Sequence, residues 1–444
     1  GNAIGNGQVV LGDSSSSATA TLYLSTMVAV CGSFGTGCSA GYSSQAESGI
    51  MEDLGLTVAE YSVFGSILTI GGMVGALPCG KVTDLLGRRG GAWLLDFGRL
   101  SVGIGNSMLS YVVPVYIAET SPKNLRGGFT ILNQFVLVCG VTTVFLAGNL
   151  INWRLLALIG ALPSVMQVLG LFFIPESPRW LAKIGQEKGC EEVLHRLRGD
   201  NADIAKEAED IREYMKDLKG QPQAKFFDMF HMKYTYALIV GVGLMVMQQI
   251  GGANGVAFYA SSIFTAAGFS SVVGTTAMAI IQVPSTGVGV FLMDRSGRRP
   301  LLIASAAGMC FGCLIVGTSF LFQDLQRWND ATPTLVFLGI MIYSAAGTLG
   351  VSGIPWAIMS EIFPINIKAS AGSLVNMVSW FGSWIITYSF NFMMDWSATG
   401  TFFIFAGTSA LGVLFVAKLV PETKGRTIEE IQQTMTSFTE GETF

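Results

Sequence analysis

The chain has 444 residues and a formal net charge of −4; half of its residues are hydrophobic and only 13% are charged. Soluble domains carry about 25% charged residues, so this composition excludes an ordinary soluble protein and indicates several membrane-spanning helices. We therefore expect the lipid bilayer, and no nucleic acid, as a partner.

The sequence offers no pattern for a metal site, a disulfide framework or a cofactor. His195 and His231 are its two histidines, and both lie in a polar stretch. Cys310 and Cys313 form a C-x-x-C inside an apolar segment, where packing is the better interpretation. The seven cysteines lie mostly in apolar runs: Cys31, Cys38, Cys79, Cys139, Cys190, Cys310 and Cys313. We expect no metal and no cofactor.

The start of the chain is polar and serine-rich (Ser14 to Ser17), which predicts a disordered tail over residues 1–19 without a cleavable signal pattern. A membrane-spanning helix needs about 20 apolar residues. Eleven segments are candidates: 20–42, 61–79, 99–118, 128–148, 153–174, 236–258, 274–293, 300–322, 334–358, 371–393 and 400–420.

A charged stretch separates the fifth candidate from the sixth. Residues 182–233 hold 21 charged residues out of 52, with a helix-like pattern near Asp203 to Leu218. The pattern predicts a cytosolic linker with short helices over 182–235. It divides an N-terminal bundle (20–181) from a C-terminal bundle (236–420), which a cytosolic tail (421–444) follows.

Lysine and arginine predict which ends of the helices face the cytosol. Residues 1–80 contain neither, whereas basic residues follow the second, third, seventh, ninth and last segments: Lys81, Arg88, Arg89, Lys123, Arg126, Arg295, Arg298, Arg299, Lys368, Lys424 and Arg426. The joins on the other side are mostly acidic, with Arg99, Arg154 and Arg327 as exceptions. The basic loops, the linker and both termini are therefore expected in the cytosol.

An internal repeat indicates two homologous halves. A D-x-x-G-R-R motif at residues 84–89 recurs at 294–299, an offset of 210. Two other repeated features are 246 residues apart (Glu176 and Glu422) and 242 residues apart (Glu119 and Glu361). The first half is therefore short by 32 residues after its copy of the motif.

The shortage falls between Arg89 and Arg99. The nine residues between them would rise only about 14 Å as a helix, and the hydrocarbon core is about 30 Å thick. The third helix of the first half is therefore expected to be missing. Either residues 90–98 are re-entrant, or the first two helices are misoriented, or the chain is a defective or spliced isoform.

Five motifs, in order, carry a family resemblance. They are Gly80-x3-Asp84-x2-Gly87-Arg88-Arg89, Pro175-Glu176-Ser177-Pro178-Arg179-Trp180-Leu181, Gln248-Gln249-x2-Gly252-x-Asn254-x4-Tyr259, Ile354-Pro355-Trp356 with Glu361-Ile362-Phe363-Pro364, and Pro421-Glu422-Thr423-Lys424-Gly425-Arg426. The chain resembles the sugar porters of the major facilitator superfamily, most of all the plant early-dehydration-response-like monosaccharide transporters. The resemblance implies an all-α fold of two six-helix bundles, here with about eleven spans.

Amide side chains in one glycine-rich segment suggest a sugar site, because amides both donate and accept hydrogen bonds. Gln248, Gln249 and Asn254 lie there, but on an ideal helix Gln249 and Asn254 point about 140° apart. They can converge only if the helix bends, which Gly251, Gly252 and Gly255 would allow. The competing interpretation is that these amides only join helices.

Further site residues follow from the resemblance alone. It implies that Gln134 and Gln282 contact the sugar and that Trp356 and Trp380 form an aromatic platform and its neighbour, although packing is an equal alternative for Trp380. It makes Tyr259 an extracellular gate residue.

Charged residues at the cytosolic ends are expected to form an ion-pair network that holds the halves together while the site opens outward, or only to anchor topology. A single exposed ion pair contributes only about 0–1 kcal/mol to stability, so only a network of ion pairs would bias the equilibrium between conformations. Its members are Asp84, Arg88, Arg89, Glu119, Arg126, Glu176, Arg179, Asp294, Arg298, Arg299, Glu361 and Glu422.

The expected function is monosaccharide transport by alternating access, without enzymatic chemistry. Proton-coupled relatives carry an Asp in the first helix where this chain has Gly37, which favours facilitated diffusion. Ser379 replaces the Asn usual beside Trp380, which removes one potential sugar contact. The alternatives are an inactive splice isoform or a sugar sensor, and a proton–sugar symporter. We expect a monomeric unit in the vacuolar or plasma membrane.

Overall fold

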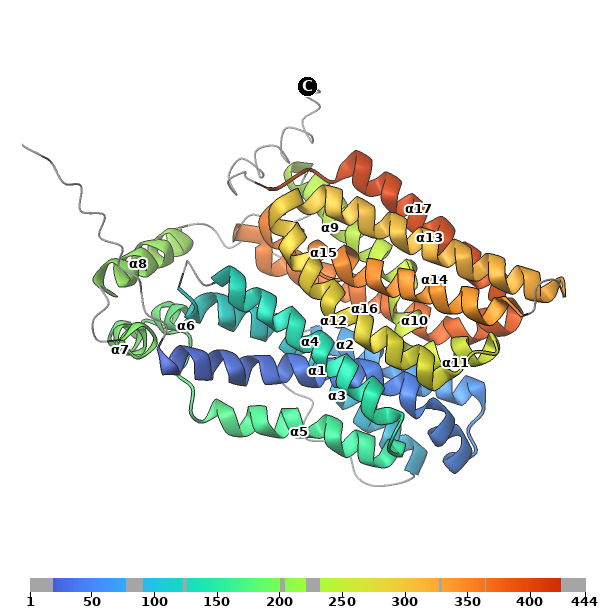
Figure 1. Ribbon diagram of the computed structural model, residues 1–444. Helices are drawn as coiled ribbons and strands as arrows, with labels where there is room; N and C mark the ends of the chain where they lie inside the picture. Colours follow the sequence, from blue (N-terminus) through green and yellow to red (C-terminus); the bar gives the residue numbers. More distant parts are fainter. Residues whose placement is uncertain are drawn as a thin grey trace, which may run out of the picture.

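In the computed structural model, the described residues are 19–76, 91–122, 126–199, 204–220, 232–326, 330–363 and 365–424. This part of the chain is helical, without strands, and its long helices lie side by side (Figure 1). The long helices before the linker are α1 (Ala20–Leu54), α2 (Val58–Ala76), α3 (Gly91–Thr120), α4 (Arg126–Gly148) and α5 (Trp153–Leu171).

Six long helical segments follow the linker among the described residues, and two of them are interrupted. The first consists of α9 (Met232–Ile250), α10 (Ala253–Phe258) and α11 (Ala260–Ala266), and the fourth of α14 (Thr332–Ala346), the π-helical turn η2 (Gly347–Val351) and α15 (Ile354–Ile362). The continuous ones are α12 (Ser271–Ser296), α13 (Arg298–Asp324), α16 (Ile365–Trp396) and α17 (Ala398–Leu419). In its described residues, each of the eleven segments expected from the sequence thus coincides with one of these continuous or interrupted helices, apart from a few turn residues at the ends and at the interruptions.

Three short helices, α6 (Pro178–Lys183), α7 (Glu187–Arg198) and α8 (Ile204–Gly220), lie beyond one end of the long helices (Figure 1). We call this end the linker face and the other end the opposite face. The start of α1 is held at the linker face, because the Thr19 hydroxyl donates to the carbonyl of Leu197 at 2.8 Å.

The lengths and surfaces of the helices suit a membrane. In the described part of the chain, six helical stretches are at least 18 residues long and apolar enough to cross one: Trp153–Leu171, Tyr234–Phe258, Ser271–Met293, Arg298–Asp324, Thr332–Met359 and Ala398–Leu419. The surface of α5 is typical, since Leu158, Leu162 and Leu169 are exposed. Such apolar surface is stable against lipid and unstable in water.

Glycines bring the helices of the first half into close contact. A Cβ atom at Gly37 of α1 would lie 2.0 Å from the carbonyl oxygen of Leu137 in α4, and one at Gly140 would lie 2.2 Å from that of Phe34. Small residues permit this backbone approach between membrane helices, where dispersion and not hydrophobic burial drives association.

Helices α2 and α3 run toward the same face. In α3, Asn106 donates to Ser39 of α1 at 2.5 Å, and Arg99 nearer its start donates to Ser43, further along α1. Helix α3 is therefore antiparallel to α1 and ends at the linker face. Helix α2 begins four residues after α1 ends and also runs toward the linker face.

The α3 helix decides one of the alternatives for residues 90–98. Residues 91–98 continue the third span as its first two turns, within a helix of 30 residues, so a re-entrant segment there is the wrong expectation. In a complete six-helix half, a helix running the other way would connect two such parallel neighbours. The missing third helix stays a prediction.

Candidate functional site

A cavity of about 350 Å³ lies between the two halves. Helices α1 to α4 line it from one side, and α9, α10, α12 to α16 and η2 from the other. The structure places all seven residues expected to bind substrate in its wall: Gln134, Gln248, Gln249, Asn254, Gln282, Trp356 and Trp380. Every residue of the wall is uncharged, so the cavity suits a neutral polar molecule.

The bend expected in the amide-rich segment is present. Helix α9 ends at Ile250, and Gly252 has a φ of 86°, a left-handed conformation that glycine adopts without strain. The freed carbonyl of Gly251 accepts a hydrogen bond from the Tyr343 hydroxyl at 2.8 Å. The break turns Asn254 back, and its amide donates to Gln249 Oε1 at 2.6 Å.

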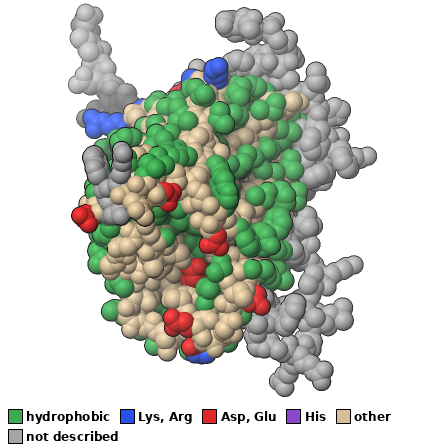
Figure 2. Space-filling model, turned by 90° about the vertical axis from the view of Figure 1, so that its right-hand side faces the viewer, with side chains coloured by type: hydrophobic (Ala, Val, Ile, Leu, Met, Phe, Trp, Pro, Cys, Tyr) green, Lys and Arg blue, Asp and Glu red, His purple; other side chains and the backbone are tan. Residues whose placement is uncertain are grey.

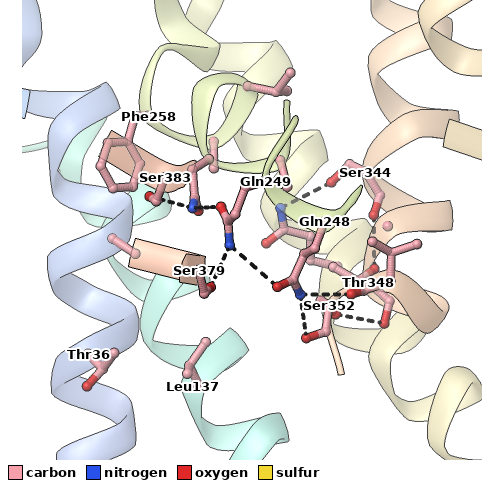
Figure 3. Close-up of a pocket in the computed structure, with 18 of the residues that line it drawn as sticks. Thr36, Leu137, Gln248, Gln249, Phe258, Ser344, Thr348, Ser352, Ser379 and Ser383 are labelled. Atoms are coloured by element: carbon pink, nitrogen blue, oxygen red, sulfur yellow. Dashed lines mark hydrogen bonds between the residues drawn. The ribbon is translucent and has the colours of Figure 1, made fainter. Parts of the chain in front are cut away.

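Side-chain hydrogen bonds fix the amides before any ligand arrives (Figure 3). Gln248 donates to the carbonyl of Val351 at 2.8 Å, and Gln249 donates to the Ser379 hydroxyl at 3.0 Å. Asn254 also donates to Ser383 at 2.7 Å. These bonds link α9 and α10 to η2 and α16, and an amide with one group engaged keeps others for a ligand.

The remaining predicted residues extend the wall. Gln282 donates to the Ser344 hydroxyl at 3.1 Å. Trp356 is 40% exposed, and it lines the cavity together with Trp380. The two rings offer an aromatic surface to the less polar side of a ligand. Gln134 comes from α4, so both halves supply an amide.

The sequence did not single out several small polar residues of the wall. Among them are Thr36, Ser39, Asn106, Ser344, Asn376 and Ser383. Serine and threonine are common in membrane helices and usually bond to their own backbone, so nothing in their spacing distinguished these. The sequence pointed to Ser379 only because it replaces an Asn that could contact the sugar. In the structure, Ser379 accepts the hydrogen bond that orients Gln249.

Tyr259 lies outside the cavity wall, between α10 and α11. Its side chain is fully buried, its hydroxyl donates to the carbonyl of Thr387 at 3.0 Å, and its ring stacks on Phe390 at 5.2 Å. A Cβ atom at Gly65 of α2 would lie 2.9 Å from the Tyr259 oxygen. Tyr259 thus contacts both halves, and its role as a gate stays a prediction.

The charged residues expected at the linker face are partly brought together in the second half. Arg298 Nη2 lies 3.2 Å from Glu361 Oε1. Glu422 accepts the backbone N–H groups of Arg298 and Arg299, each at 3.1 Å, at the start of α13. A carboxylate at a helix N-terminus is stabilising.

In the first half, fewer of the charged residues expected at the linker face are described. Glu119 accepts a hydrogen bond from the Ser177 hydroxyl, and Glu176 accepts one from the Ser177 backbone at 3.0 Å. The half-buried Arg179 lies nearby in α6. Outside the described residues are Asp84, Arg88 and Arg89, together with the side chains of Arg126 and Asp294.

Long apolar helices surround an uncharged cavity whose wall mixes amides and hydroxyls with apolar side chains, which fits a carrier of small neutral solutes, and comparison with known proteins gives the family. Residues 90–435 match the family model described as sugar (and other) transporter. The chain belongs to this sugar transporter family.

Its relatives include two sugar transporters of Arabidopsis thaliana. ERD6-like 17 is 49% identical over 440 residues, covering 95% of this chain and 93% of that protein. ERD6-like 16 is 50% identical over 429 residues, covering 92% and 89%.

Solved structures with a similar fold include the xylose transporter XylE from E. coli. Its partially occluded inward open conformation is 23% identical, covers 92% of this chain and 100% of that chain, and has a TM-score of 0.75. Its inward open conformation has a TM-score of 0.73 at 23% identity, covering 93% and 99%. The fold is therefore that of the major facilitator superfamily, as expected.

Proposed function

We propose that the chain carries a monosaccharide across a membrane by alternating access of the cavity between its halves. The observation that supports this most directly is the uncharged wall, in which amides and hydroxyls lie among apolar side chains and two tryptophans. Sugars offer hydroxyls around a ring with a less polar face, and such a wall complements both. Family membership and fold favour a working transporter over an inactive isoform or a sensor.

Contacts between the halves support a cavity that opens to the linker face in this conformation. The hydrogen bonds between the halves gather toward the opposite face: Ser261 N–H donates to Ser44 at 3.0 Å, Asn149 to Thr276 at 3.0 Å, and Asn391 to Ser62 at 3.2 Å. Opening to the opposite face requires these bonds to break.

We place the linker face in the cytosol. The view of the opposite face shows acidic side chains across it and few basic ones (Figure 2). Exposed acids at that end of the helices include Glu52, Glu60, Asp324, Asp330 and Asp395. Excess lysine and arginine on the other side is the usual cytosolic signal. We propose the vacuolar or the plasma membrane as the location of the protein, and a single chain as its functional unit.

Facilitated diffusion is the proposed mode. The position at which proton-coupled relatives are expected to have an aspartate is Gly37, and a Cβ atom there would lie 2.0 Å from the Leu137 carbonyl oxygen. In this packing α1 has no room for a carboxylate at that position. Transport needs no covalent step, so we propose no enzymatic activity.

Uptake of radiolabelled D-glucose, D-fructose and D-xylose into liposomes that contain the purified protein tests the proposal. We expect saturable uptake of at least one sugar that stops when the internal and external concentrations are equal. Sucrose serves as the control for leakage. Folded protein without saturable uptake of any monosaccharide would contradict the proposal.

A further inference from the structure

Glu47 is a buried carboxylate at the boundary between the halves. It lies in α1 near the opposite face, and only 9% of its surface is exposed. Its Oε2 accepts a hydrogen bond from the hydroxyl of Ser262 in α11, which belongs to the other half. The sequence shows Glu47 only as one of several acids in a loop region, because its burial arises from the docking of the second half.

The surroundings of Glu47 bridge the same boundary. One turn earlier in α1, Ser44 accepts the backbone N–H of Ser261 at 3.0 Å. Nearby, Asn391 of α16 donates to Ser62 of α2 at 3.2 Å. The carboxylate is therefore part of the set of contacts that close the opposite face, and opening this face would expose it to water.

The titratable groups around Glu47 come from four elements. Tyr61 of α2 and Tyr259 at the start of α11 are fully buried, and Tyr42 lies on α1 itself. The cation of this region is Arg99 of α3, which donates to Ser43 and whose guanidinium carbon lies 5.4 Å from the centroid of the Phe64 ring. Among the described residues, Glu47 forms no ion pair with Arg99 or with another cation.

We propose that Glu47 and Ser262 form a proton-sensitive latch that closes the opposite face of the carrier. Burying an ionised carboxylate among uncharged partners costs more free energy than burying a protonated one. The latch is therefore tighter when Glu47 is protonated, and it loosens when Glu47 ionises and becomes hydrated. Acid on the opposite side favours the closed conformation and slows sugar entry from that side.

The latch regulates transport and does not couple it to protons. In the closed conformation Glu47 is covered on the opposite face, and it is absent from the wall of the cavity that faces the linker. A proton taken up at Glu47 thus has no described path to the other side. The latch rests on the proposed function only for its effect on sugar flux; its opening can be measured without sugar.

Hydrogen exchange of the full-length protein in nanodiscs tests the latch without relying on transport. In the wild type, we expect protection of the α11 amides, including that of Ser261, to fall about tenfold between about pH 5 and pH 8 after correction for intrinsic exchange, which corresponds to about 1.4 kcal/mol. Glu47→Gln, which stays neutral and keeps an acceptor, should remain protected at both pH values. Glu47→Ala, which removes the acceptor for Ser262, should be less protected than Glu47→Gln, and to the same extent at both pH values.

Glu52→Gln is the matched control, because Glu52 lies five residues further along α1 and is exposed. It should behave as the wild type does. The latch is overturned if Glu47→Gln keeps the pH dependence of the wild type, or if Glu47→Ala keeps full protection of α11. If exchange follows the expected pattern while no sugar is carried, the latch stands and the proposed function fails.

Discussion

Gln249 is the residue on which the candidate site depends most. It accepts from Asn254 at 2.6 Å and donates to Ser379 at 3.0 Å, so it joins the broken helix to α16. The sequence predicted that these amides converge because glycines follow Gln249. It did not predict Ser379 as a partner, because that contact joins residues 130 positions apart.

We expect Gln249→Ala to lower sugar uptake at least tenfold, or about 1.4 kcal/mol in binding, while folded protein is retained. The reason is that the variant removes one amide of the wall and one of the two acceptors of the Asn254 amide. Saturable uptake in liposomes and size-exclusion chromatography measure the two effects. Gln323→Ala is the control, since Gln323 is a glutamine of α13 outside the cavity wall. An unchanged affinity for sugar in Gln249→Ala would show that Gln249 does not belong to the binding site.

At the scale of helices, close packing decides how the first half is arranged. A Cβ atom at Gly103 of α3 would lie 1.9 Å from the carbonyl oxygen of Leu68 in α2, and one at Gly71 would lie 2.1 Å from that of Leu100. The sequence predicted both helices, but with 55 glycines in the chain it did not indicate which ones form a contact between helices.

Gly103→Ala is therefore expected to destabilise the protein by about 1–3 kcal/mol, because the added methyl group forces α2 and α3 apart. Thermal unfolding in detergent measures the change. Gly105→Ala is the matched control: it lies on the same helix with no atom within 4 Å of the added Cβ, so its stability should be unchanged or slightly higher. Equal melting temperatures for the two variants would contradict the contact.

At the scale of the whole molecule, the parallel course of α2 and α3 is the least usual feature. The internal repeat indicated a shortage of 32 residues after Arg89, which exceeds the roughly 20 residues that one spanning helix needs. A first half with one helix fewer than six would explain the parallel course of α2 and α3, and it stays a prediction.

Insertion of an apolar helix of about 20 residues after Arg89 is expected to raise the melting temperature of the protein without changing which sugar is carried. A spanning helix there would connect the parallel helices α2 and α3 across the membrane, and the residues expected to bind substrate already line the cavity without it. Sugar uptake by both forms is measured in hexose-transport-deficient cells, and thermal unfolding of both forms is measured in detergent. Uptake that appears only after the insertion would instead support the inactive isoform.

Sugar uptake is also expected to be insensitive to protonophores, because Gly37 leaves no room for the carboxylate of a proton-coupled carrier. Initial rates in intact cells, with and without a protonophore at constant external pH, measure this. Strong inhibition while the membrane stays intact would show that another group couples transport to protons. The latch at Glu47 responds to external pH itself, so the external pH has to be buffered.

The sequence by itself predicted the helical segments and the break in the amide-rich helix, because apolar length and glycine breaks are local properties, and its five motifs indicated the family through resemblance. Only the tertiary structure decided what surrounds these elements. The hydroxyl partners of the amides, the glycines at helix contacts and the burial of Glu47 depend on residues far apart in the chain. Their positions follow from packing of the two halves, which local pattern does not encode.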